Sequence, residues 1–497
     1  MDRGRNKKRR VGASLDQAVF DVWGRELGAV NSRAFSSRLS ASEDIVLRFD
    51  IDKKLDKHRG CVNTVSFSDD GDILVSGSDD RKIILWDWQT GEVKFSFHSC
   101  HHNNVFQAKI MPYTDNRTIV TCAADGQVRL AQILEKGVET LLLANHGGRA
   151  HKLAVEPGSP YIFYSCGEDA RVQHFDLRTK TATDLFTCKK RNHGKRNMAM
   201  VHLNTIAIDP RDPNLLAVAG SSEYARVYDI RKYKWNGSSD MGKPVNFFCP
   251  LNLVGDEHMG ITGLAFSDQS ELLVSYNDEF IYLFTWEMGL GSDFESISPK
   301  SGESKASEMT GSPSSVSADE NLSPQVYKGH RNSETVKGVG FFGPKCEYVV
   351  SGSDCGRIFI WNKKDGKLLR VMEADMHVVN CIEAHPHAPV LASSGIEHDI
   401  KVWTPKAIEN AVLPEKIEKV RPRSRRWMNR ISSPQDVMWQ LFSLQRWRDL
   451  ENGNEDSSSS VVGQDLMELA MAFNRTDGAS LDDGDDLSGS GPEDYFS

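Results

Sequence analysis

The chain has 497 residues and a formal net charge of -9 at pH 7, and hydrophobic residues make up 39% of it. Because globular domains usually contain about 45–50% apolar residues, part of the chain should lie outside any packed core. The nine cysteines form no Cys-x-x-Cys pair, which disfavours a disulfide framework and a zinc ribbon. No apolar run approaches the roughly 18–20 residues of a membrane span, so we expect neither a secreted nor a membrane protein.

The amino end carries a basic segment followed by a predicted helix. Residues 1–13 should be disordered, and their basic cluster at 6–11 could act as a nuclear import signal. We therefore expect the protein in the nucleus and the cytoplasm. Residues 14–44 are expected to be helical, with Ser14 as the N-cap of a helix that reaches Val30. One face of this helix holds Val19, Phe20, Trp23 and Leu27. That face must pack either on the rest of the chain or on a partner.

Residues 58–88 show the first copy of a strand and turn pattern. An alternating apolar stretch at 62–67 is followed by a polar turn at 69–72. A second turn at 79–80 separates two further apolar stretches, and a fourth strand is expected near 93–97. This order is typical of a four-stranded antiparallel meander.

The same pattern recurs down the chain. The first apolar residues of the seven copies are Val62, Val105, Ala150, Leu203, Ile261, Val336 and Val379. Most of these copies lie about 43–58 residues apart, and a four-stranded unit of about 40–45 residues is typical of WD40 repeats. The chain thus resembles the WD40 family, and we predict an all-β, seven-bladed propeller over residues 45–404. The strand-like stretch at 45–51 should complete the last blade.

In WD40 repeats a His, a Ser or Thr, an Asp and a Trp form a hydrogen-bonded tetrad. In the first repeat this tetrad would fall on His58, Ser76, Asp80 and Trp86. The Trp is replaced in the next four repeats by Ala131, Phe175, Tyr228 and Phe284. The tetrad His of repeats two, three and six could be His101, His146 and His330.

Three segments should lie outside the repeats. Residues 292–324 hold 11 serines among 33 residues and are predicted to form a disordered insertion, either merely tolerated or phosphorylated at its three Ser-Pro pairs. Residues 405–450 combine a basic segment with a helix that begins at Ser433-Pro434. Residues 451–497, with 12 acidic residues and one basic residue, should form a disordered acidic tail. The rest of the chain is close to neutral, so nucleic-acid binding is not expected.

Two short patterns could suggest a nucleotide-binding loop or a metal site, but neither has the surrounding structure or spacing that such a site needs. Residues 338–343 match GxGxxG, but they lie within a predicted strand and no helix follows to bind a phosphate. The histidines and cysteine at 98–102 fit no zinc spacing. We therefore predict a protein that is not an enzyme and that has no cofactor and no metal.

Two similar tetrapeptides end the third strands of repeats three and four. They are Phe-Asp-Leu-Arg at 175–178 and Tyr-Asp-Ile-Arg at 228–231. In each, the Asp and Arg could simply form a salt bridge that ties the turn. They also resemble the W-D-x-R motif with which WD40 receptors of cullin-4 ligases contact the ligase adaptor.

A wider resemblance covers residues 23–405. The runs at 58–66, 104–110, 151–157, 275–284, 351–356 and 385–395 are similar to those of the DDB-and-cullin-4-associated factors, most closely the eighth member. The resemblance implies a non-catalytic substrate receptor of a cullin-4 RING E3 ubiquitin ligase. The DDB adaptor, and through it cullin-4, would bind at Asp176, Arg178, Asp229 and Arg231. A protein substrate of unknown identity would bind the opposite face.

The candidates for that substrate face follow the start of each repeat's first strand. They are Asn63, Phe106, His151, Asn204, Thr262, Lys337 and Asn380. A ring of amide, imidazole and aromatic groups could recognise a peptide, or the same groups could complete hydrogen bonds of the loops. The alternative function is a WD40 scaffold of a nuclear protein complex without a link to ubiquitin ligation. Nucleic-acid binding through residues 416–430 ranks below both.

Overall fold

The computed structural model describes residues 18–191, 198–232, 242–256, 258–292, 323–333 and 335–413. The predictions for residues 1–13 and 451–497, for most of the insertion and for the carboxyl-terminal helix lie outside these ranges. None of the helices within the described ranges is long and apolar enough to cross a membrane.

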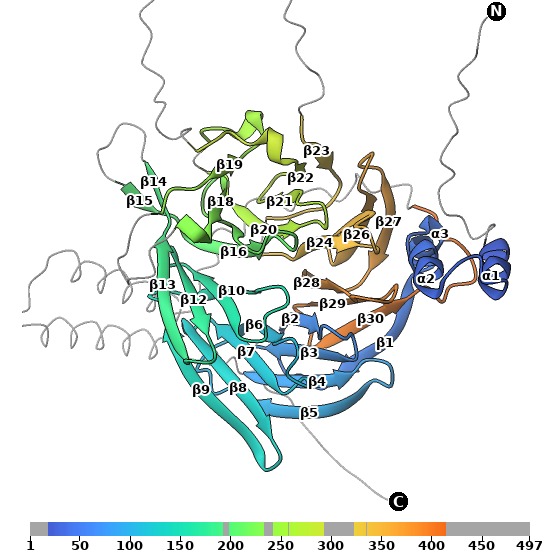
Figure 1. Ribbon diagram of the computed structural model, residues 1–497, viewed down its shortest axis with the longest axis horizontal. Helices are drawn as coiled ribbons and strands as arrows, with labels where there is room; N and C mark the ends of the chain where they lie inside the picture. Colours follow the sequence, from blue (N-terminus) through green and yellow to red (C-terminus); the bar gives the residue numbers. More distant parts are fainter. Residues whose placement is uncertain are drawn as a thin grey trace, which may run out of the picture. The chain divides into compact units, whose positions relative to one another are not determined.

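The described chain folds into a seven-bladed β-propeller, as predicted, and each blade is a four-stranded antiparallel sheet (Figure 1). Blades one and two contain β2 (Val62–Phe67), β3 (Ile73–Ser78), β4 (Lys82–Asp87) and β5 (Glu92–His98), then β6 (Val105–Ile110), β7 (Thr118–Ala123), β8 (Gln127–Leu134) and β9 (Gly137–Asn145). Blades three and four contain β10 (Ala150–Val155), β11 (Ile162–Gly167), β12 (Arg171–Asp176) and β13 (Thr181–Thr187), then β16 (Leu203–Ile208), β17 (Leu215–Gly220), β18 (Ala225–Asp229) and β19 (Asn246–Phe248).

The remaining blades follow the same order. Blades five and six contain β20 (Ile261–Phe266), β21 (Leu272–Tyr276), β22 (Ile281–Phe284) and β23 (Gln325–Tyr327), then β24 (Val339–Phe342), β25 (Tyr348–Gly352), β26 (Arg357–Asn362) and β27 (Leu368–Glu373). Blade seven contains β28 (Val379–Ala384), β29 (Leu391–Gly395) and β30 (Asp399–Thr404). A short hairpin of β14 (Lys189–Arg191) and β15 (Met198–Met200) precedes blade four, and the 3-10 turns are η2 (Ile230–Lys232), η3 (Leu251–Leu253) and η4 (Trp286–Met288).

The ring closes through a strand from the amino-terminal side of the repeats. Strand β1 (Asp50–Asp56) pairs antiparallel with β30 and completes blade seven. The prediction of a closing strand was right in kind, but its position at 45–51 was wrong. Residues Glu43–Leu47 form a short helix, α3, that begins after Ser42 and has two acidic residues in its first turn, which is a helix-start pattern.

The core lies between neighbouring blades. The second and third strands of blade one contribute Ile73, Val75, Ile83 and Leu85 to a cluster with Val105, Ala108 and Ile119 of blade two. A single small sheet cannot bury both of its faces, so each blade relies on its neighbours in the ring for stability.

The direction of the strands defines two faces of the propeller. The first strand of each blade lies innermost, and these strands contact one another around the centre (Figure 1). We call the face where the first strands begin the top face and the face where they end the bottom face. Because each blade is a meander, the turns between second and third strands lie on the top face, and those between third and fourth strands lie on the bottom face.

Two further helices precede α3. Helix α1 spans Ala18–Glu26, and α2 spans Ser32–Ser40 with the Asn31 side chain accepting a hydrogen bond from Ala34 N at 2.7 Å. The predicted apolar face of α1 does not pack on the described propeller, since Trp23 and Phe20 are 60% and 69% exposed.

Candidate functional site

The structure brings together the four predicted tetrad residues of blade one. His58 Nε2 lies 2.7 Å from Ser76 Oγ, and its Nδ1 lies 3.0 Å from an Asp80 carboxylate oxygen. Trp86 Nε1 donates to the same Ser76 hydroxyl at 2.8 Å. Burial alone would raise the pKa of Asp80, but hydrogen bonds from His58 and from two backbone N–H groups lower it to about 2.

Blades two and three keep the His part of this arrangement without the Trp. His101 lies 2.9 Å from Thr121 Oγ1 and 3.2 Å from Asp125, and His146 lies 2.7 Å from Ser165 Oγ and 2.9 Å from Asp169. In place of the Trp of blade three, Phe175 stacks on Phe163 with ring centroids 4.4 Å apart.

His330 does not make the tetrad contacts in blade six. Both of its ring nitrogens are buried without a hydrogen-bond partner among the described residues, and Trp361 Nε1 donates instead to the Lys328 carbonyl at 2.9 Å. Burial and, less strongly, the nearby Lys337 lower the pKa of His330 to about 4. The residue four before Val336, where blades one to three place the His, is Asn332.

Blade seven replaces the His and Asp of the tetrad with a cluster of opposite charges. Asp375 lies four residues before Val379, at the His position. Its carboxylate lies 2.5 Å from Lys401 Nζ, which also lies 2.8 Å from Glu397 and 2.6 Å from Asp399. Three carboxylates this close could hold a metal ion, but the ammonium of Lys401 already occupies the space among them.

On the bottom face, Asp176 and Arg178 form a tight fork. The Asp176 carboxylate accepts hydrogen bonds from Arg178 Nη2 at 2.7 Å, from its Nε at 3.0 Å and from its backbone N at 2.9 Å. The Arg178 side chain remains 61% exposed and lies over the ring of Tyr161, 5.7 Å from its centroid. The fork lowers the pKa of Asp176.

Blade four repeats this geometry. Asp229 accepts from Arg231 Nε and Nη2, each at 2.9 Å, and from its backbone N at 3.1 Å. The Arg231 side chain is 59% exposed. In both blades the bidentate contact fixes a guanidinium whose outer edge faces solvent, an arrangement suited to a partner's carboxylate or carbonyl groups.

A cavity of about 440 Å³ opens where the first strands end. It lies on the same face as the two arginines, and its wall includes residues 156–158 of blade three and 206–208 of blade four. Lys109 crosses part of it, with Nζ 3.0 Å from Glu383 and 2.8 Å from Ser66 Oγ.

On the top face, six of the seven substrate candidates share one backbone position. The pairing between the first and second strands skips one residue near the strand start, which marks a β-bulge. The skipped residues are Asn63, Phe106, His151, Asn204, Thr262 and Asn380. Since a bulge residue makes no regular ladder pair, its side chain can contact the next blade.

Two asparagines use that freedom in the same way. Asn63 Nδ2 donates to the carbonyl of Val105 at 3.0 Å, and Asn204 Nδ2 donates to the carbonyl of Ile261 at 3.1 Å. Each acceptor is the first residue of the next blade's first strand. These amides therefore hold neighbouring blades together.

Other candidates also connect blades. The rings of Phe106 and His151 stack with centroids 5.1 Å apart, and His151 Nε2 lies 3.2 Å from Glu168. Thr335 Oγ1 donates to Asn380 Oδ1 at 2.8 Å. Most residues of the predicted ring thus also make contacts within the protein, and their role in binding a substrate stays a prediction.

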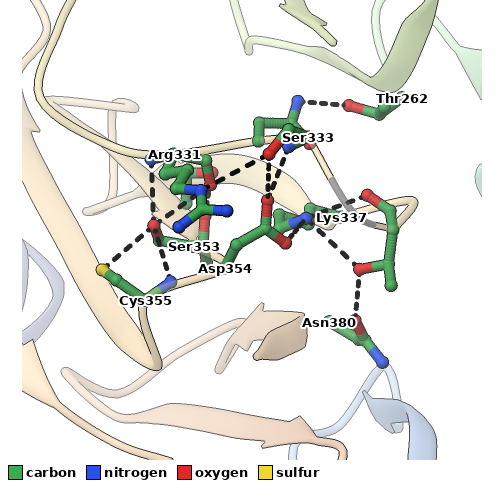
Figure 2. A network of polar contacts seen from close by, with 12 residues as sticks. Thr262, Arg331, Ser333, Lys337, Ser353, Asp354, Cys355 and Asn380 are labelled. Carbon is green, nitrogen blue, oxygen red and sulfur yellow. Dashed lines mark hydrogen bonds and ion pairs between the residues drawn. The ribbon is translucent and has the colours of Figure 1, made fainter. Parts of the chain in front are cut away.

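Thr262 and Lys337 belong to a buried polar network between blades five, six and seven (Figure 2). Asn332 Nδ2 donates to Thr262 Oγ1 at 2.8 Å and to the Tyr276 carbonyl at 2.7 Å. Lys337 forms a buried ion pair with Asp354. The network stabilises the loops that enter blade six.

A second cavity, of about 390 Å³, lies on the top face at blades four to six. We call it the top pocket. Its lining residues are Asn204, Ser221, His258, Met259, Gly260, Thr262, Asn277, Ser333, Thr335 and Val336. Sequence reasoning found only Asn204 and Thr262 of these. The others lie in the loops before the first strands and in the turns after the second strands, so topology could have indicated them but not their meeting in one pocket.

Comparison with known proteins identifies the repeats and several relatives. The family model described as "WD domain, G-beta repeat" matches residues 50–87, 322–362 and 366–404. "DDB1- and CUL4-associated factor 6" is 34% identical over 283 residues in Mus musculus and 33% identical over 285 residues in Homo sapiens. "Protein ALTERED SEED GERMINATION 2" of Arabidopsis thaliana is 31% identical over 292 residues.

These matches cover parts of each protein. They take in 54%, 55% and 52% of this chain and 31%, 32% and 39% of the respective relatives. The chain therefore contains WD40 repeats and spans about a third of the length of the curated relatives it matches.

Proposed function

We propose that this chain is a non-catalytic substrate receptor of a cullin-4 RING E3 ubiquitin ligase. The DDB adaptor binds the bottom face, and a protein substrate binds the top face. Within the DDB-and-cullin-4-associated factors, the sequence runs quoted above favour the eighth member. Support comes from relatives that are named for association with DDB1 and CUL4.

The observation that carries the proposal is the repeated fork on the bottom face. Arg178 and Arg231 occupy equivalent positions of adjacent blades, and each is held by its own Asp with the guanidinium exposed. Exposed ion pairs contribute little to stability, so two in register are better explained by a partner than by the fold. A fixed guanidinium also loses little side-chain entropy when a partner binds it.

The two faces can act independently. Turns between third and fourth strands place the forks on the bottom face, while the top pocket is built from loops of the opposite face. An adaptor on one face would therefore leave the other accessible to a substrate.

The test is affinity capture from cells, with quantification of the DDB adaptor. We expect the wild type to recover the adaptor and the Arg178→Ala, Arg231→Ala double variant to lose at least nine-tenths of it. Lys364→Ala is the matched control, because Lys364 is the exposed cation at the same position of blade six. It should retain the adaptor.

Two outcomes would contradict the proposal. Equal adaptor recovery by the wild type and the double variant would show that the forks do not contribute to the adaptor interface. Absence of adaptor from the wild-type capture would leave a WD40 scaffold without a ligase, and the other captured proteins would then indicate its complex.

A further inference from the structure

We infer that the cavity on the bottom face is an anchor site for the DDB adaptor, and that it accepts an apolar side chain from a segment whose carboxylates bind Arg178 and Arg231. We call this cavity, whose wall includes Pro157 and Ala207, the bottom cavity. The inference rests on the proposed function, because it names the part of the adaptor that the receptor would bind. It extends the interface from the two forks to the centre of the propeller.

Most of the residues that line the bottom cavity are apolar. Blades two, three and four contribute aliphatic side chains and prolines, among them Ile110, Pro112, Val155, Ile206 and Ile208. The volume of about 440 Å³ lies within the roughly 300–1,000 Å³ that is typical of ligand pockets. Such a cavity suits a protruding side chain or the tip of a loop, and not a folded domain.

Small residues make room for an anchor on one side of the bottom cavity. The fifth residue of the first strand is Lys109 in blade two and Glu383 in blade seven, but it is Ala154 in blade three and Ala207 in blade four. All four residues line the cavity. The side with the shorter side chains is thus that of blades three and four, which also carry the forks.

The charged groups of the lining disfavour a charged anchor of either sign. Lys109 is paired with Glu383, and its aliphatic stem adds to the wall. Asp69 and Glu156 also line the cavity, and burial raises the pKa of Glu156. A carboxylate would be repelled by these acids, and an ammonium would lose hydration at a mostly apolar wall beside Lys109. The carboxylates of a bound segment would therefore lie outside, at the forks.

In blade three a short turn connects the bottom cavity to the fork. Pro157 lines the cavity, and Tyr161 follows four residues later. The Arg178 guanidinium lies over the Tyr161 ring, 5.7 Å from its centroid, and the Tyr161 carbonyl accepts a hydrogen bond from Leu177 N at 3.0 Å. The rim of the cavity and the fork are therefore one continuous surface.

Blade four repeats this connection. Ile208 lines the cavity, and Asp212 follows in the next turn with its carboxylate 3.9 Å from Arg231 Nη2. Ile230 N donates to the Asn214 carbonyl at 2.9 Å, and Asn214 Nδ2 donates to Asp212 at 2.8 Å. Because these bonds hold the rim before a partner arrives, little flexibility is lost on binding.

One segment of the adaptor can therefore use both features of this face. Guanidinium groups bind carboxylates, and an apolar cavity binds an apolar side chain. Protein interfaces usually concentrate their binding energy in a few buried anchors and arginines. The occupant is thus an acidic segment with an apolar residue at its centre. It belongs to the adaptor, because the forks that adjoin the cavity face the adaptor in the proposed function.

The first experiment measures capture of the DDB adaptor by cavity variants of the full chain. Ala207→Phe fills the cavity and should lower adaptor recovery at least tenfold. Ala124→Phe is the matched control, because it adds the same side chain in the turn between β7 and β8 on the top face. It should recover as much adaptor as the wild type.

Pro157→Glu tests the same site without changing the core, since Pro157 is exposed. The added carboxylate lies beside Glu156 and should repel the acidic segment, which again lowers adaptor recovery at least tenfold. Pro344→Glu is its control, because Pro344 is an exposed proline in the corresponding turn of blade six and does not line the cavity. Thermal melts identify any variant that is not folded, and Pro157→Glu decides the question if Ala207→Phe is not.

The second experiment uses the purified full chain and four pools of labelled 12-residue peptides. Two pools have Leu, Ile, Met or Phe at the centre, with Asp and Glu on both sides in one and Lys and Arg in the other. The remaining pools keep the acidic flanks around a central Ser or a central Lys. We expect the acidic pool with the apolar centre to bind best. Ala207→Phe should weaken this binding at least tenfold, and the double arginine variant should lose the preference for acidic flanks.

The outcomes separate the two proposals. Preference for another pool, absence of binding to every pool, or binding that Ala207→Phe leaves unchanged would overturn the inference. Adaptor lost by the double arginine variant but retained by folded Ala207→Phe and Pro157→Glu would overturn the inference alone and leave the proposed function standing. Absence of the adaptor from the wild-type capture would refute the ligase role, and with it the adaptor as the occupant.

Discussion

Asp375 and Lys401 form a buried ion pair, 2.5 Å between carboxylate and ammonium, where blade one holds His58 against Asp80. Both side chains are 1% exposed. In blade seven, too, the loop before the first strand is bonded to the rest of the sheet, but the bond is an ion pair and not a hydrogen bond to a histidine. A buried pair of this kind is sensitive to the loss of one partner.

Lys401→Met should destabilise the propeller by about 3–5 kcal/mol, because three carboxylates would remain close together without their cation. Chemical denaturation measures the free energy of unfolding. Lys54→Met is the matched control, since Lys54 lies 4.0 Å from Asp399 but is 58% exposed, and it should change the stability by less than about 0.5 kcal/mol. Equal effects of the two variants would contradict a buried role for Lys401.

The stability of the protein should depend on His330 as the pH falls. The pKa of His330 is about 4 in the folded protein, below the 6.5 of an unperturbed imidazole. Between these values the unfolded chain binds a proton that the folded chain does not, so stability is present above pH 6.5 and is lost as the pH falls towards 4. The loss amounts to about 3 kcal/mol.

His330→Phe removes this titration while preserving an aromatic ring against Trp361. Unfolding free energies of the wild type and the variant, measured from pH 7 to pH 4, should therefore diverge, with the shallower slope for the variant. Parallel curves would show that His330 is accessible to protons in the folded state.

Trp86→Phe should lower the free energy of unfolding by about 1–3 kcal/mol. The variant loses the hydrogen bond to Ser76, and the smaller phenylalanine ring leaves part of the buried volume of the tryptophan unfilled. Trp286→Phe serves as the control because Trp286 is 45% exposed, and it should have a much smaller effect. The prediction fails if both substitutions cost the same.

Arg178→Ala with Arg231→Ala should leave the melting temperature near that of the wild type, since both guanidinium groups face solvent. Differential scanning fluorimetry is sufficient for this comparison. A large drop in melting temperature would show that the forks stabilise the fold. Loss of the adaptor by the double variant could then no longer be attributed to a lost interface.

Much of the propeller could be predicted because its local signals agree. In blade one, the apolar alternation of 62–67 and the polar turns at 69–72 and 79–80 all indicate the same meander. The closing strand was misplaced because the apolar residues Ile45, Val46 and Leu47 resemble a strand. The start of a helix at Ser42, with acidic residues directly after it, was the stronger signal.

The positions of the top-face residues could be predicted from the sequence, but their contacts could not. The repeat pattern places Asn63 and Asn204 one residue after the start of a first strand, but their hydrogen-bond acceptors lie 42 and 57 residues further on, in the next blade. The β-bulge at these residues allows this contact, and a bulge is visible only in the paired backbone, not in the sequence. In blade six the sequence offers His330 as the tetrad His, but Asn332 stands four residues before Val336, at the position that His occupies in blades one to three.

The pairing of β1 with β30 sets a condition on the order in which the protein matures. These strands are separated by more than 300 residues, so at roughly 5–20 residues per second the ribosome needs on the order of 20–70 s to deliver the second after the first. During that time β1 presents an unpaired edge, the kind of surface on which chains aggregate. The edge of β1 is thus covered only when the last blade has been translated. Slower translation would lengthen the time for which this edge stays unpaired.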